Sequence, residues 1–258
     1  MRLIDTHTHI YMPDFDADRA EVVERARQAG VEKMMLPAVD LSSIEPMRKL
    51  RDSYPGVFAL AAGIHPTELG DEPKAAVDTV AELLEQNPGE FAAVGEIGID
   101  LYWDRSHETE QMDIFERQMN VAARLGLPVI IHCREALDQI LEVLSGLDNV
   151  PSGVFHSFTG DSRDVDRIHH DAGDFYFGLN GVATFKSCHV TDALDAIGSE
   201  RLLFETDAPY LAPVPNRGKR NEPSFVADTA RFIAARKGYD IEELAAKTSE
   251  NAVRLFGI

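Results

Sequence analysis

The sequence predicts an α/β protein with a single domain, folded as a (β/α)8 TIM barrel. Apolar segments of strand length alternate with amphipathic segments eight times along the 258 residues, an average repeat of about 32 residues. Some strand segments, such as Val129-Ile130-Ile131, are continuous apolar runs, as expected for parallel strands covered on both faces. An open doubly wound sheet is the alternative, but eight regular units without a linker favour closure.

Each predicted strand is a short apolar segment followed by polar or turn-forming residues. The first begins at Leu3 and Ile4, close to the N-terminus. The eight expected strands cover residues 3–6, 33–39, 57–64, 91–96, 128–132, 153–156, 174–179 and 201–205.

The helical segments have apolar residues every three or four positions, and some have clear boundaries. Gly30 and Gly126 end the first and fourth helices, and Ser42 or Ser43 caps the second. The other expected helical boundaries are 16–29 for the first helix, then 74–85, 108–125, 135–144, 162–171, 191–197, 224–237 and 241–256. The last two helices follow a loop rich in Pro and Arg after the eighth strand.

The composition is that of an ordinary folded protein, with 44% hydrophobic and 27% charged residues. No apolar run approaches the roughly 20 residues that span a bilayer, and we expect no secretion signal before the first strand. Cys133 and Cys188 have no metal-ligand spacing, so we expect reduced, buried thiols in a cytoplasmic protein. Since no apolar repeat indicates an interface, we expect a monomer without an obligatory protein partner.

The net charge of −19, from 44 acidic and 25 basic residues, is the one unusual bulk property. Such a surface favours solubility and repels polyanions at long range. One interpretation is adaptation to a salty cytoplasm, where screening weakens self-repulsion. The other is an ordinarily acidic cytosolic enzyme.

The first strand leads into Asp5-Thr6-His7-Thr8-His9, with two histidines at alternate positions. Side chains two apart on a strand point to the same face, about 7 Å apart along the strand. Both imidazoles could therefore converge on one metal ion, although a core or surface role is also compatible with this pair.

Other strands also end in residues that bind metals. In a barrel these C-terminal ends meet on one face, where catalytic groups lie. The candidates are His65, Glu96, His132, His156 and Asp207, after the third, fourth, fifth, sixth and eighth strands. The remaining histidines fall in helices or loops and are expected to be solvated: His107, His169, His170 and His189.

This set exceeds the three protein ligands of a typical catalytic zinc ion. It suits two divalent ions about 3.5–4 Å apart that share a carboxylate and a water. Glu96 can bridge them because both of its oxygens are acceptors. Two such cations lower the pKa of the shared water and stabilise charge on the reacting oxygens, which is the chemistry of hydrolysis. No Ser or Cys nucleophile stands in a suitable motif.

Longer motifs extend this pattern over the whole chain: Asp-Thr-His-Thr-His (5–9), Gly-Ile-His-Pro (63–66), Gly-Glu-Ile-Gly-Ile-Asp (95–100), Pro-Val-Ile-Ile-His-Cys-Arg (128–134), His-Ser-Phe-Thr-Gly (156–160), Leu-Leu-Phe-Glu-Thr-Asp-Ala-Pro-Tyr-Leu (202–211), Arg-Gly-Lys-Arg-Asn-Glu-Pro (217–223) and Asn-Ala-Val-Arg-Leu-Phe (251–256). With these motifs in this order, the chain resembles the TatD family of metal-dependent hydrolases, a branch of the amidohydrolase-type barrels. Related barrels often bridge their metals with a carboxylated Lys from the fourth strand, whereas Glu96 is the TatD arrangement.

The resemblance implies two metal sites that share one carboxylate: His7, His9, Glu96 and Asp207 hold one ion, and Glu96, His132 and His156 hold the other. Glu96 and Asp207 are then the catalytic carboxylates, and Asp207 also orients the water and accepts its proton. The family is associated with Mg-dependent DNase activity, chiefly trimming of single-stranded DNA from its 3′ end. Mn and Zn are also compatible with a site rich in histidine.

Substrate contacts are expected from the loops around this site. The cations Arg217, Lys219 and Arg220 suit phosphate recognition, unless this loop is simply a surface loop paired with Glu222 or other acids. Because the chain has one small basic cluster, we expect a grip on about two or three nucleotides at a strand end rather than on a long duplex.

Four further residues are candidates on the same face. His65 could donate to a substrate phosphate or serve the core, and Arg134 is a weaker phosphate candidate. Tyr102 and Trp103 could stack on a base or simply pack. Asp100 is expected to support the metal ligands.

Three functions remain open at this point. The first is a two-metal phosphodiesterase, a 3′ exonuclease on single-stranded DNA. The second is a metal-dependent hydrolase of small esters, amides or lactones. The third is a non-catalytic scaffold, which a complete set of metal-binding groups disfavours.

Overall fold

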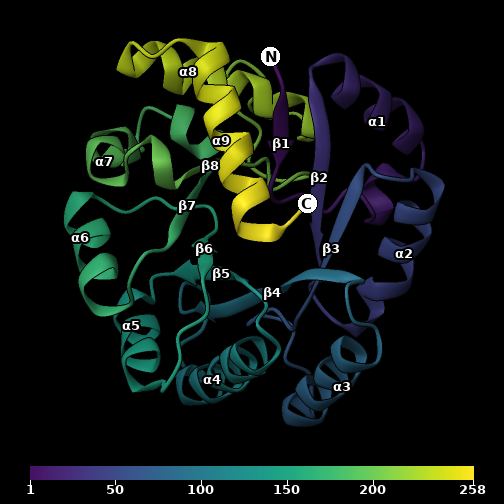
Figure 1. The fold of residues 1–258 in the computed structure, drawn as a ribbon, viewed down its shortest axis with the longest axis vertical. Coiled ribbons are helices and arrows are strands. Elements are labelled where there is room, and N and C mark those ends of the chain that lie inside the picture. The colour runs from purple at the N-terminus through teal and green to yellow at the C-terminus, as the bar shows by residue number, and fades with distance from the viewer.

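Eight parallel strands follow one another in chain order around the computed structural model, which describes residues 1–258 (Figure 1). The strands are β1 (Leu3–Asp5), β2 (Val31–Pro37), β3 (Phe58–Ala62), β4 (Phe91–Asp100), β5 (Val129–Arg134), β6 (Gly153–Phe155), β7 (Tyr176–Leu179) and β8 (Leu202–Phe204). The last strand returns to the first, because the Thr6 N–H donates to the Phe204 carbonyl at 3.1 Å and the Asp207 N–H to the His7 carbonyl at 2.8 Å. This order and these bonds confirm the (β/α)8 barrel and exclude the doubly wound sheet.

The helices surround the strands and cover the outer face of the barrel (Figure 1). They are α1 (Arg19–Gln28), α2 (Ile44–Ser53), α3 (Pro73–Gln86), α4 (Glu108–Leu125), α5 (Leu137–Gly146), α6 (Ser162–Asp171), α7 (Val190–Ile197), α8 (Val226–Lys237) and α9 (Ile241–Phe256). The predicted bounds of α4, α6 and α9 are confirmed.

The starts of α3, α5, α7 and α8 differ from the prediction by one or two residues, and a larger difference concerns the start of α1. Helix α1 begins three residues later than expected, at Arg19, because Pro13–Phe15 forms a separate 3-10 turn. Ser43 is the N-cap residue of α2, one of the two predicted alternatives, but its side chain makes no capping hydrogen bond to this helix. The Asp40 carboxylate accepts from the backbone N–H of Ser43 and opens the 3-10 turn that precedes the helix.

The interior of the barrel is apolar, and one buried residue from each strand contributes to it: Ile4, Met35, Ala61, Ala93, Ile130, Val154, Tyr176 and Leu203. Helix α9 completes this cluster with Ala252, Leu255 and Phe256, and it crosses the centre of the barrel in Figure 1. One end of the barrel is therefore closed by apolar packing, which leaves the opposite, C-terminal ends of the strands for polar groups.

Strand β4 is longer than predicted and continues to Asp100. Its register against β5 shifts between Val94 and Ile97, so Glu96 lies in an irregular part of the strand rather than at its end. Gly98 allows this path, because its φ is 149° and a Cβ there would lie 1.9 Å from the carbonyl oxygen of His132. The glycines of the Gly-Glu-Ile-Gly motif thus permit close contact between β4 and β5.

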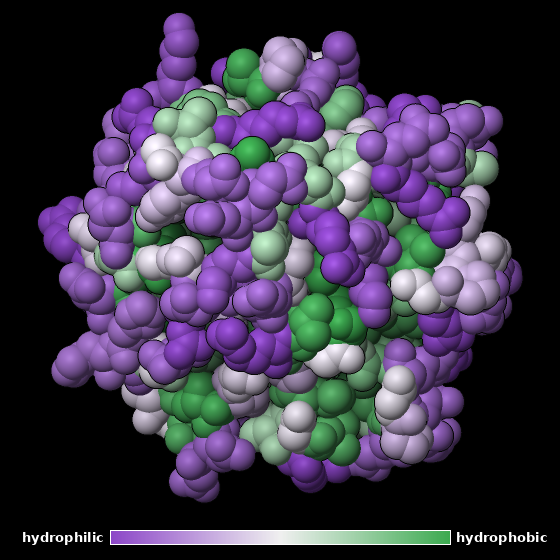
Figure 2. All heavy atoms as spheres, turned by 45° about the horizontal axis from the view of Figure 1, so that its top comes forward, coloured by the Kyte–Doolittle hydropathy of each residue, from purple (hydrophilic) through white to green (hydrophobic).

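The surface is mostly polar. On the face shown in Figure 2, hydrophilic side chains predominate and hydrophobic ones form separate patches. None of the helices combines the length and the apolar composition that a bilayer-spanning segment requires.

Candidate metal centre

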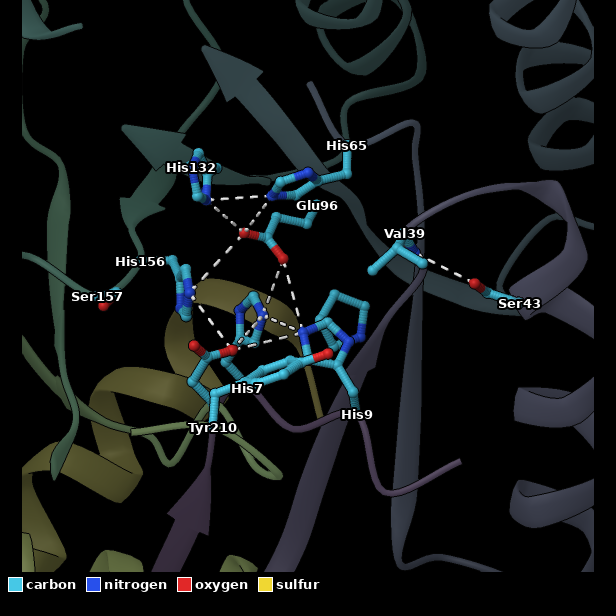
Figure 3. A network of polar contacts seen from close by, with 12 residues as sticks. His7, His9, Val39, Ser43, His65, Glu96, His132, His156, Ser157 and Tyr210 are labelled. Atoms are coloured by element: carbon cyan, nitrogen blue, oxygen red, sulfur yellow. Dashed lines mark hydrogen bonds and ion pairs between the residues drawn. The ribbon is translucent and has the colours of Figure 1, made fainter. Parts of the chain in front are cut away.

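Five histidines and two carboxylates converge at the C-terminal ends of the strands (Figure 3). His7 and His9 follow β1, His65 follows β3, Glu96 and His132 lie within β4 and β5, and His156 and Asp207 follow β6 and β8. The structure therefore brings together all six residues expected to bind metal, and His65 joins them.

Glu96 lies between two sets of imidazole nitrogens, and each of its oxygens faces one set (Figure 3). Oε2 lies 3.1 Å from Nε2 of His7 and 3.7 Å from Nε2 of His9. Oε1 lies 2.9 Å from Nδ1 of His132, 3.4 Å from Nε2 of His65 and 3.8 Å from Nε2 of His156. One carboxylate therefore separates two groups of donors, as a bridging ligand does.

Asp207 contacts both groups from the β8 side. Its Oδ1 lies 3.5 Å from Nε2 of His9 and 3.8 Å from Nε2 of both His7 and His156. The residue has a φ of 59°, a left-handed conformation that aspartate tolerates better than most side chains.

The donor set fits divalent cations. The Nε2 atoms of His7 and His9 face each other at 3.0 Å, a separation compatible with two bonds of about 2.1 Å to one ion. Both rings are buried, and the donor groups around them are imidazoles and carboxylates. Such a mixed set suits zinc or manganese as well as magnesium.

Three of the imidazoles are held from behind by a second polar group. Nδ1 of His9 lies 3.1 Å from the Tyr11 hydroxyl, which donates to the carbonyl of Pro37. Nε2 of His132 lies 2.9 Å from Asp100 Oδ2, as expected of a supporting residue. Nδ1 of His156 lies 2.9 Å from Glu205 Oε1. These partners fix the orientation of the rings.

Both carboxylates of the centre have a pKa below the ordinary value. Burial opposes the charge on Glu96, but the imidazoles of His7 and His65 outweigh burial and hold its pKa well below the ordinary value. Burial also opposes the charge on Asp207, and contact with His9 lowers its pKa below the ordinary value. The site thus presents anionic oxygens to a cation.

The pKa of His156 is shifted upwards, in contrast to the pKa values of these carboxylates. Burial disfavours its charged form, but Glu205 and then Glu96 raise its pKa to about 10. Burial lowers the pKa of the neighbouring His7, whose ring stacks on His156 with centroids 3.5 Å apart.

Sequence reasoning missed two of these supporting residues, Glu205 and Tyr11. Glu205 is buried, and its Oε1 also accepts from the backbone N–H of Ser157 at 2.6 Å. A signal existed, since Glu205 is an acid at the end of an apolar strand, two residues before Asp207. Nothing in the sequence around Tyr11 distinguishes it from a core tyrosine.

A cleft of about 690 Å³ opens over the donors. Among the residues expected to contact substrate, His65 and Arg134 line it, and Trp103 lines it as well. Tyr102 lies behind Arg134, whose guanidinium is 3.7 Å from the centroid of the Tyr102 ring.

The three cations after β8 do not line this cleft. Arg220 donates to the Asp14 carbonyl at 2.6 Å and pairs with Asp18 at 2.7 Å. Arg217 lies over the ring of Phe185, and Lys219 is exposed near Asn216. Arg220 is therefore paired with an acid, as in the alternative interpretation of this loop. The acid is Asp18 rather than Glu222, which pairs with Arg25.

Two smaller expectations need correction. His107, His170 and His189 are exposed, but His169 is half-buried, with its ring centroid 5.7 Å from that of Phe177. The cysteines, Cys133 and Cys188, are free but only partly buried.

Comparison with known proteins shows similarity to one family of metal-dependent hydrolases along the whole chain. The family of TatD related DNases matches residues 4–257. The sequence is 37% identical over 259 residues to the metal-dependent hydrolase YabD of Bacillus subtilis, with 99% of each chain covered. It is 34% identical over 263 residues to the 3′-5′ ssDNA/RNA exonuclease TatD of Klebsiella pneumoniae, with 99% of this chain and 98% of the relative covered.

A solved structure agrees with these sequence matches. The crystal structure of YJJV, a TatD homologue from Escherichia coli K12, superposes with a TM-score of 0.92 at 29% identity. The match covers 100% of this chain and 98% of that one. The similarity therefore includes every element that carries a donor group.

Proposed function

The chain belongs to the TatD family of metal-dependent hydrolases, and we propose that it is a two-metal phosphodiesterase that shortens single-stranded DNA or RNA from the 3′ end. The family membership agrees with the resemblance seen in the sequence. The 3′-5′ direction and the single-stranded substrate are those named for the Klebsiella relative.

The observation that carries this proposal is the position of Glu96 between two groups of donors. Its Oε2 faces His7 and His9, and its Oε1 faces His132. One ion would be held by His7, His9, Glu96 and Asp207, and the other by Glu96, His132 and His156. When bound, two such ions supply an acidified water and stabilise negative charge on phosphoryl oxygens.

The side chains of this protein do the remaining work. Asp207 touches both groups of donors, has a pKa below the ordinary value and is placed to accept a proton from the attacking water. His65 has its Nδ1 2.8 Å from the Thr67 hydroxyl, so its Nε2 is directed to the donors around Glu96. We assign this nitrogen to a phosphate oxygen of the substrate.

Short single-stranded ends are the preferred substrate class because the cleft has little positive charge of its own. Arg134 is the one Lys or Arg side chain that lines it, and the net charge of the chain is −19. Long-range attraction to a duplex requires many basic contacts. We therefore keep the expectation of a grip on about two or three nucleotides, with Arg134 at a phosphate. Arg217, Lys219 and Arg220 then contribute less than the sequence predicts.

The decisive experiment uses one oligonucleotide labelled at its 3′ or its 5′ end, incubated with Mg, Mn or Zn. We expect the 3′ label to be released first, in the form of mononucleotides. Glu96→Gln keeps the shape of the side chain but removes the bridging charge, and we expect it to lower kcat by at least about a hundredfold. Glu142→Gln, at an exposed position, is the matched control.

A second candidate is a hydrolase of small esters, amides or lactones. The single cation in the cleft favours it, because such substrates need little electrostatic capture. If the protein binds two ions but cleaves no oligonucleotide with any metal, this alternative replaces the nuclease. In either case we expect a monomer that acts in the cytoplasm.

A further inference from the structure

We propose that two aromatic walls on opposite sides of the metal centre hold the nucleobases on either side of the scissile phosphate. The first wall is Trp103 with Arg134, and the second wall is Tyr210 with Leu211. This inference rests on the proposed function and defines its substrate as at least two unpaired, consecutive nucleotides.

The two walls come from opposite sides of the ring. Trp103 follows β4, and Tyr210 follows β8. Because the eight strands are ordered sequentially around a closed barrel, β4 and β8 lie four strands apart in both directions. All four side chains line the cleft that also contains Glu96. A phosphate bound at the centre therefore has one wall on each side.

The exposure of these side chains is high for their type. Trp103 is 76% exposed, Tyr210 52% and Leu211 38%. Exposed aromatic rings beside a polar centre are expected where a flat, apolar ligand group binds. Nucleobases are such groups, and stacking on aromatic side chains tolerates every base.

The first wall is braced from within. The Arg134 guanidinium lies 3.7 Å from the Tyr102 ring centroid and 5.5 Å from that of Trp103, and the two rings meet edge to face at 4.8 Å. The Tyr102 N–H donates to Asp100 Oδ1 at 3.0 Å, and Asp100 Oδ2 also contacts His132. This wall is therefore connected to a metal-binding histidine through one carboxylate.

The second wall is held by its backbone. The buried side-chain amide of Asn221 donates to the carbonyls of Thr206 and Tyr210, at 2.8 and 2.6 Å. The Tyr210 N–H donates to the Asp207 carbonyl at 2.8 Å, so the wall is fixed relative to the catalytic carboxylate. Leu211 follows with a φ of 58°.

Gly181 lets the segment after Tyr210 pack closely. A Cβ at that glycine would lie 2.1 Å from the Leu211 carbonyl oxygen. Both walls thus exist before a ligand arrives, which lowers the entropy lost on binding.

This arrangement explains how the protein would select the ends of nucleic-acid strands through base stacking rather than through electrostatic attraction. Bases in a duplex are stacked on each other and paired, so their faces are not free to contact two opposed walls. Unpaired bases at a frayed or single-stranded end are free to do so. A small ester, which has no second base, would contact the metal centre alone.

The test uses Tyr210→Leu and Trp103→Leu, with Tyr210→Phe and Trp103→Phe as conservative partners. Loss of one stacked base weakens binding by about 5- to 150-fold. We expect each Leu variant to raise KM for a single-stranded oligonucleotide by this factor, with kcat nearly unchanged, and each Phe variant to restore most of the loss. Tyr239→Leu, 40% exposed and outside the cleft, is the matched control.

Abasic oligonucleotides locate each contact. For the wild-type protein, removal of the base at the position that Tyr210 contacts should weaken binding by the same factor as Tyr210→Leu. The variant should then be insensitive to that removal, because the two changes delete one interaction. Equal losses from the abasic site in wild type and variant would overturn the proposal.

Binding is also measurable without cleavage, because Trp103 is the single tryptophan of the chain. A phosphorothioate trinucleotide, titrated in Mg²⁺, should change the tryptophan fluorescence, and the abasic version should not. If wild-type protein cleaves oligonucleotides while both Leu variants keep its KM, the walls are refuted and the nuclease stands. If it neither binds nor cleaves them, both proposals fail.

Discussion

At the scale of single residues, the metal centre is a set of imidazoles whose directions are fixed from the side away from the cleft. Asp100 and Glu205 perform this role for His132 and His156 through carboxylates at 2.9 Å. A carboxylate behind a histidine orients the ring and makes its free nitrogen more basic, so it strengthens a metal bond. Glu205 does so while nearly completely buried.

Glu205→Gln should weaken metal binding by about 10- to 100-fold, because it removes the negative charge behind His156 while keeping the shape of the side chain. Calorimetric titration with Mn²⁺ or Zn²⁺ measures the loss, which should affect one of two binding events. A circular dichroism spectrum like that of wild type would show that the fold is retained. Unchanged affinity for both ions would mean that Glu205 serves the fold alone.

Single residues also show which parts of the metal centre could be predicted from the sequence. The donors could be predicted, because a histidine or acid after each apolar strand must reach the same face of the barrel. The fate of Arg220 could not, because its contact with Asp18 joins segments about 200 residues apart. Tertiary packing decides which cations remain free for a ligand.

At the scale of elements, α9 determines where the polar centre can be. Its last turn places Leu255 and Phe256 against the apolar interior of the barrel. That end of the barrel is consequently closed, and ligands reach the metal centre from the C-terminal ends of the strands alone. The sequence predicts this helix with correct bounds, but its docking into the barrel does not follow from periodicity.

Phe256→Ala should destabilise the protein by about 3–5 kcal/mol, since it leaves a cavity in a packed cluster where this ring is 5% exposed. Urea unfolding followed by circular dichroism measures the change. Val253→Ala, in the same helix but 46% exposed, should cost less than about 0.5 kcal/mol. Similar losses from both variants would show that α9 does not seal the barrel as a packed element.

Element boundaries illustrate a second limit of the sequence. Helices with strong periodicity, such as α4 and α6, have the predicted bounds, whereas β4 extends four residues beyond its predicted end. The additional residues of β4 pair with β5 beyond the register shift around Glu96, up to Asp100 with Arg134. A period of two residues along one segment contains no information about a bulge that the neighbouring strand induces.

At the scale of the whole molecule, the excess of acid has two opposite effects on stability. Exposed pairs such as Arg2 with Glu32 attract, while the net charge of −19 repels. Surface pairs contribute about 0–1 kcal/mol each. Unpaired exposed acids such as Glu82, Glu142 and Asp166 add repulsion that no partner offsets. We expect repulsion to dominate at low ionic strength.

Salt should therefore stabilise this protein. Between about 0.01 and 1 M KCl the Debye length falls from roughly 30 to 3 Å, which screens the repulsion among distant acids more than the attraction within contact pairs. Thermal unfolding should shift to higher temperature over this range. The triple variant Glu82→Gln/Glu142→Gln/Asp166→Asn should unfold at a higher temperature than wild type in low salt, with a smaller difference in high salt. A flat salt profile in both proteins would show that the acidic surface serves solubility rather than stability in a salty cytoplasm.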